Sequence, residues 1–231
     1  MELEYDIFLE NEQVKIEYHN GKSIEYELQP LPHQFLQWQS EARLKMYEQI
    51  QLGGVNSVKT LPAHLPVLAT QSNKNQFVNL ATKGLGLLPK KNKVHEFLNL
   101  FIETKNLCNS QPWESTIKKR METVIKYYKN LNNFDPYFLG GLEIFEGTTF
   151  KNIARNPLVS LLYTGTAPKF LSFQIHGIIK IIQNENLYYQ FLLSARELFA
   201  FDSFHVIQSS YPFGYLFYIV NIKEKTPFSR K

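Results

Sequence analysis

Seven polar residues in two short segments carry side chains that can bind a phosphate group. They are Asn79, Thr82 and Lys83 in the first segment, and Thr148, Thr149, Lys151 and Asn152 in the second. Hydroxyl, amide and ammonium groups donate hydrogen bonds to phosphate oxygens, and those from a cation are the strongest. We therefore predict an anion-binding site to which both segments contribute. The second segment is also typical of a capped surface turn that leads into a short helix, and this alternative stays open.

A proline corner sets the position of the second segment. Asn156-Pro157 separates it from the apolar run Leu158 to Tyr163. Because proline has a fixed φ and no N–H, it is excluded from helix interiors and from central strands. The pattern predicts a short helical turn before Pro157 and a buried strand after it. The first segment belongs to the end of a strand pair that we expect at 67–70 and 76–82.

The remaining elements follow from the period of the apolar residues along the chain. Strands are expected at 5–9, 14–18, 23–28, 142–145, 170–182 and 215–222, and helices at 33–51, 93–107, 112–130 and 187–199. Asn20-Gly21 indicates a tight turn between two of the N-terminal strands. Gly177, inside a long apolar strand, indicates a bulge or a bend.

The composition is that of an ordinary soluble globular protein, with 44% hydrophobic and 20% charged residues among 231. This length suits one sizeable domain with an appendage. The single cysteine, Cys108, excludes an internal disulfide framework and fits a reducing compartment. The N-terminus lacks the pattern of a signal peptide, and no run is long enough to cross a membrane. The sequence therefore predicts a cytoplasmic protein.

The corner and the strands around it resemble the pyridoxamine 5'-phosphate oxidase-like family of FMN-binding split barrels. In that family, a polar segment that can bind the FMN phosphate leads through an Asn-Pro corner into a barrel strand, as 148–163 would here. The resemblance covers roughly 65–88 and 142–222. It departs from the family at Thr148-Thr149, where the common form has Ser or Arg followed by Lys. The nearest cation of this chain is Lys151.

The resemblance implies an α+β fold, a split β-barrel of the FMN-binding type with an N-terminal β-hairpin/helix extension and a helical insertion. The extension would span 1–60 and the barrel domain 61–231, with the insertion at about 92–133. The implied activity is an FMN-dependent oxidoreduction of a small molecule by a homodimer, with the seven polar residues named above as the FMN-binding set. No residue stands out as a catalytic acid or base. The insertion would either cover the cofactor or build the dimer.

Two alternatives to a flavoenzyme remain. Some split-barrel relatives bind or degrade haem, and His176 and His205 would then be the first ligands to test. The net charge of +4 and the lysine-rich stretches 90–93 and 118–129 also allow an RNA-binding or acidic-partner module, although such runs are usually solvated faces.

Other chemistry is disfavoured by spacing. The six histidines are scattered, and no pair has the spacing that puts two imidazoles on one helix face. A Cys108–His95 nucleophile is less expected than a buried structural cysteine. Gly84-Leu85-Gly86 follows a strand but lacks the third glycine and the helix of a nucleotide loop.

Overall fold

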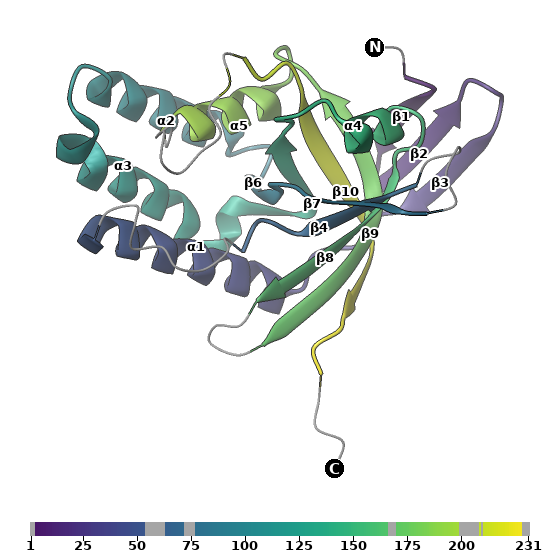
Figure 1. The fold of residues 1–231 in the computed structure, drawn as a ribbon, viewed down its shortest axis with the longest axis horizontal. Coiled ribbons are helices and arrows are strands. Elements are labelled where there is room, and N and C mark those ends of the chain that lie inside the picture. Colours follow the sequence, from purple (N-terminus) through teal and green to yellow (C-terminus); the bar gives the residue numbers. More distant parts are fainter. Residues whose placement is uncertain are drawn as a thin grey trace.

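The computed structural model in Figure 1 describes residues 3–53, 63–71, 77–165, 170–198, 208 and 210–227. Its helices are α1 (His33–Gly53), α2 (Val94–Cys108), α3 (Trp113–Tyr128), α4 (Thr148–Ile153) and α5 (Leu187–Leu198), with a short 3-10 helix, η2 (Leu131–Asn133). Its strands are β1 (Tyr5–Glu10), β2 (Gln13–Tyr18), β3 (Ser23–Glu27), β4 (Val67–Thr70), β5 (Asn79–Thr82), β6 (Gly86–Pro89), β7 (Phe134–Leu142), β8 (Leu158–Gly165), β9 (Leu171–Ile182) and β10 (Gly214–Glu224).

The strands from β4 to β10 form one antiparallel sheet that closes on itself. The order is β5-β4-β8-β9-β10-β7-β6, so the two ends of the sheet are consecutive in the chain and are joined by residues 83–85. The β4–β5 ladder continues through this link, because Lys83 N donates to Pro66 O and Leu85 N donates to His64 O. β6 then pairs with β7. The segment 79–89 therefore connects both ends, and the sheet is a barrel.

The N-terminal strands β1, β2 and β3 form a separate small sheet. The predicted Asn-Gly turn joins β2 to β3, and Gly21 has the positive φ of 86° that glycine adopts without strain. Glu4 N donates to Ala154 O, and Tyr5 OH donates to Ile153 O at 2.8 Å. These bonds fix the small sheet to the end of α4. Buried side chains of β1 and β2 belong to the same hydrophobic core as those of the barrel.

The helices α1, α2, α3 and α5 gather on the side of the barrel that lies away from β1–β3 (Figure 1). α2 packs against α3 and α5, and α1 packs against α3. α2, α3 and α5 each bury one mainly apolar face, as the 3.6-residue period predicts. None of the helices in the described part of the chain is long and apolar enough to span a membrane.

The prediction of a strand at 142–145 is wrong. β7 ends at Leu142 and begins eight residues earlier, at Phe134, so that it includes Pro136 and both glycines. Pro136 is tolerated because neither β6 nor β10 is in register with it. Gly140 and Gly141 are required by space, since a Cβ at either position would overlap Leu88 or the carbonyl oxygen of Gly84.

The proline corner is confirmed. α4 ends before it, β8 begins directly after Pro157, and the Asn156 side chain accepts a hydrogen bond from Leu158 N at 3.1 Å. The irregularity expected at Gly177 is also present, on the partner strand: the register of β10 shifts between Ile219 and Asn221, opposite Gly177. A Cβ at Gly177 would overlap the ring of Phe217, which explains the glycine.

Candidate functional site

The helical period of α4 divides the second predicted phosphate-binding segment into two faces. Thr149 and Asn152 are buried, whereas Thr148 and Lys151 are exposed. Residues three apart lie on the same side of a helix, so each pair forms one face. The sequence interpretation treated all four as one cluster, but only the exposed pair is available to a ligand in solution.

The buried pair takes part in a hydrogen-bond network that we call the α4 network, made of Thr70, Asn79, Thr149 and Asn152. Asn79 Nδ2 donates to Thr149 Oγ1 at 2.9 Å and to Thr70 Oγ1 at 3.2 Å. Asn152 Nδ2 donates to Thr70 Oγ1 at 3.1 Å. The two segments do meet, as predicted. They meet to bind each other, because both N–H groups of Asn79 already have acceptors within the protein.

Lys83 forms a buried ion pair with Glu143. Its Nζ lies 2.5 and 2.6 Å from the two carboxylate oxygens, which also accept hydrogen bonds from Phe145 N and from the hydroxyl of Tyr215. Burial, with the adjacent Glu143 carboxylate, raises the pKa of Tyr215, so it remains a neutral donor. The carboxylate of Glu143 compensates the charge of Lys83.

Thr82 is exposed on β5, beside the exposed Leu80 on the same face of the strand.

A cavity of about 430 Å³ lies between α1, α3, α5 and the strands β6 and β7; we call it the helix–barrel cavity. Its walls carry six aromatic side chains: Tyr47, Phe101, Trp113, Tyr127, Tyr128 and Phe191. Four glycines, at 84, 86, 140 and 141, leave backbone exposed as part of its lining. None of the seven predicted phosphate-binding residues lines this cavity, so it is separate from the anion-binding site that the sequence predicts.

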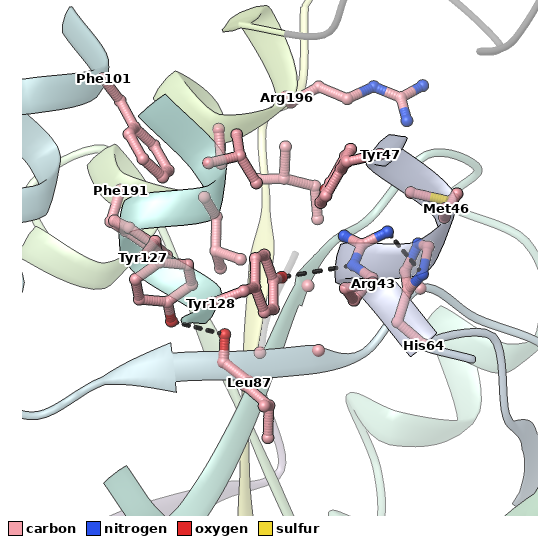
Figure 2. A pocket seen from close by; sticks show the side chains of 18 of the residues that line it. Arg43, Met46, Tyr47, His64, Leu87, Phe101, Tyr127, Tyr128, Phe191 and Arg196 are labelled. Atoms are coloured by element: carbon pink, nitrogen blue, oxygen red, sulfur yellow. Dashed lines mark hydrogen bonds between the residues drawn. The ribbon is translucent and has the colours of Figure 1, made fainter. Parts of the chain in front are cut away.

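Arg43 on α1 is the central charged group of the helix–barrel cavity. Figure 2 shows its guanidinium between His64 and Tyr128. One terminal nitrogen lies 2.9 Å from His64 Nδ1, and Nε donates to Tyr128 OH at 3.3 Å. The guanidinium carbon also lies 5.5 Å from the ring centres of Tyr47 and of Tyr128, within the range of cation–π attraction.

The described residues that line the cavity include Arg43 and Arg196 but no Asp or Glu. Burial alone would lower the pKa of Arg43, but Tyr128 and Tyr47 beside it hold that pKa above its ordinary value, so the guanidinium is charged. Burial raises the pKa of Tyr127, which donates to Leu87 O at 2.9 Å (Figure 2). The lining is thus aromatic and cationic, a composition suited to a flat anionic molecule.

The two histidines considered as haem ligands are His176 and His205. His176 is bonded through both ring nitrogens, to Ser160 Oγ at 2.7 Å and to Gln174 Nε2 at 3.0 Å. Neither nitrogen is free for haem iron. His205 lies outside the described residues. The part of the chain that the structure describes holds no group of three or more His, Cys, Asp or Glu that could bind a metal ion.

The interpretation of the basic stretch 118–129 as a solvated face or a binding surface is wrong for Arg120. It is buried, stacks on the ring of Trp113 at 4.8 Å and donates to Leu198 O at 2.6 Å. It therefore ties α3 to α5 and is not part of a solvated cationic face. Lys118 and Lys119 are exposed. Cys108 is buried, as expected of a structural cysteine.

Comparison with known proteins gives similarity in structure only. No family model matches the chain, and no curated protein matches it. HupZ of Group A Streptococcus is 15% identical, with a TM-score of 0.42 over 79% of this chain and 92% of HupZ. An FMN-binding protein of Syntrophomonas wolfei subsp. wolfei is 9% identical, with a TM-score of 0.42 over 84% of this chain and 94% of that one.

A Listeria innocua protein proposed to be a pyridoxamine 5'-phosphate oxidase is 12% identical, with a TM-score of 0.39 over 80% of this chain and 97% of that one. The names of two of these three proteins mention FMN or pyridoxamine 5'-phosphate oxidase. At such identities and TM-scores the similarity concerns the general course of the chain. The fold of this protein rests on the strand pairing described above, and its function on its own cavity.

The sequence interpretation did not find the helix–barrel cavity, although it held one signal. Arg43 lies within the apolar stripe of α1, three residues before Met46 and four before Tyr47, where an amphipathic helix normally has only apolar side chains. A cation in such a stripe indicates a buried partner or a ligand. Gly84-Leu85-Gly86, dismissed as a nucleotide loop, forms the barrel closure and part of the cavity lining.

Proposed function

We propose that this protein binds a flat organic cofactor in the helix–barrel cavity, with FMN as the first candidate and an oxidoreduction of a small molecule as the function. The observation that carries the proposal is the aromatic lining of a cavity of about 430 Å³. Cavities of roughly 300–1,000 Å³ with apolar walls and few polar groups are typical of small-molecule sites. FMN would supply the electron chemistry.

The residues present fit such a ring. Tyr47 and Tyr128 are buried and provide rigid faces, and aromatic faces stack on flat rings at low entropic cost. Gly86 has no side chain, so its backbone is part of the wall. A Cβ at this position would meet no atom closer than 3.7 Å, so there is open space beside this backbone. These groups would orient the ring and exclude water from it. The homodimer and the cytoplasmic location expected from the sequence stay predictions.

FMN titration of the purified protein tests the proposal, followed by flavin absorbance and fluorescence. We expect a shifted flavin band on binding. Ala195→Trp, on the cavity side of α5, should fill the space and weaken binding by at least about tenfold, a loss of about 1.4 kcal/mol. Gln190→Trp, on the exposed side of the same helix, is the matched control and should bind as the unmodified protein does.

Three results would decide against this proposal. A protein that never acquires a flavin band excludes FMN. A Soret band in the purified protein would replace FMN by haem, the alternative cofactor. Equal binding by Ala195→Trp and Gln190→Trp would move the flavin out of the cavity, to the exposed face of α4 that carries Thr148 and Lys151.

A further inference from the structure

We infer that Arg43 is the anion-recognition residue of the helix–barrel cavity, and that the natural ligand carries a phosphate or carboxylate group beside its ring. This inference rests on the proposed function and narrows it to one class of ligand. It also assigns anion binding to a residue on α1, far in the sequence from the seven that were predicted to bind a phosphate group.

The first argument is the charge of Arg43. Five salt bridges link the described residues, and none of them includes Arg43. Among the described residues its partners are Tyr128 OH, His64 Nδ1 and two aromatic faces, and all of these groups are uncharged. A half-buried guanidinium without a carboxylate is costly. An anionic ligand would supply the missing charge.

The second argument is the number of donors. An arginine side chain has five N–H groups. The described residues engage two of them, one at Nε and one at a terminal nitrogen. The other N–H groups of Arg43 have no acceptor among the described residues. Two parallel N–H groups on one edge of a guanidinium match the oxygens of a phosphate or carboxylate.

The third argument is that Arg43 is held in place. Because arginine has only donors, the contact with His64 requires that Nδ1 of the imidazole accept, which leaves the proton of the neutral ring on Nε2. The ring centres of Tyr47 and Tyr128 each lie 5.5 Å from the guanidinium carbon and further restrict its position. A cation fixed in advance loses little entropy when it binds an anion, and this position lies inside a cavity with aromatic walls (Figure 2).

The experiment compares ligands that differ only in the anion. FMN and riboflavin share the ring and differ in the phosphate; haemin and its dimethyl ester differ in the free carboxylates. We expect the unmodified protein to bind the charged member of at least one pair more tightly, by tenfold or more. Arg43→Met should remove that preference and leave the affinity for the neutral member within about twofold. Arg155→Met, an exposed arginine paired with Glu4, should keep the preference.

The outcomes separate the two proposals. If the unmodified protein binds neither member of either pair, the proposed function fails. If it binds both members of each pair equally well, the cavity takes a ring and the role of Arg43 is overturned. A preference that persists in Arg43→Met also overturns it. Should Arg43→Met not fold, Arg43→Gln, which keeps donors but loses the charge, replaces it in the same comparison.

Discussion

The α4 network and the helix–barrel cavity both place polar side chains inside the protein, and they differ in whether those groups are satisfied. In the α4 network, both N–H groups of Asn79 and the amide of Asn152 have acceptors within the chain. In the cavity, the partners that Arg43 has among the described residues are neutral, and none of them is a carboxylate. Satisfied groups rigidify a structure, whereas a charge left without its counterion indicates a ligand. Asn79, Thr149 and Asn152 are hydrogen-bonded within the protein, whereas Arg43 is the group at which we propose that an anionic ligand binds.

The largest effect on stability is expected when the buried carboxylate of Glu143 loses its ion-pair partner, Lys83. Lys83→Ala leaves the Glu143 carboxylate buried and unpaired, which should lower the free energy of unfolding by about 3–5 kcal/mol. Urea unfolding followed by circular dichroism measures this loss. The double variant Lys83→Met with Glu143→Gln removes both charges and should recover much of it. A loss below about 1 kcal/mol for Lys83→Ala would mean that the pair is solvated.

A smaller effect is expected in the α4 network. Asn152→Ala removes the bond to Thr70 Oγ1 and should cost about 1–3 kcal/mol of stability, with FMN affinity unchanged. Thr148→Ala, on the exposed face of the same helix, is the control and should leave stability within about 0.5 kcal/mol. If Asn152→Ala instead weakened FMN binding at unchanged stability, the network would be a ligand site after all.

Local patterns predicted much of the fold. The Asn-Gly turn at Gly21 and the Pro157 corner depend on one or two residues with restricted backbones, so the sequence shows them directly. The strand β7 was misplaced because Pro136 and two glycines look like breakers. Only the close approach of Leu88 and of Gly84 explains why a strand continues through Gly140 and Gly141.

The candidate site was harder to predict, for two physical reasons. Thr148 to Asn152 has the composition of a phosphate loop, but the helical period puts Thr148 and Lys151 on the exposed face and Thr149 and Asn152 on the buried one. The helix–barrel cavity gathers Arg43, His64, Tyr128 and Gly86 from segments far apart in the sequence. No local pattern connects them, because tertiary packing alone brings them together.

One titration series compares the helix–barrel cavity with the exposed face of α4 as the FMN site. FMN is the ligand, and Arg43→Met and Lys151→Met are the variants. Each substitution removes one cation, from the cavity in the first case and from the exposed face of α4 in the second. We expect Arg43→Met to bind FMN at least about tenfold more weakly than the unmodified protein, and Lys151→Met to bind it within about twofold. Weaker binding by Lys151→Met, with Arg43→Met unaffected, would contradict the assignment and return the phosphate to α4.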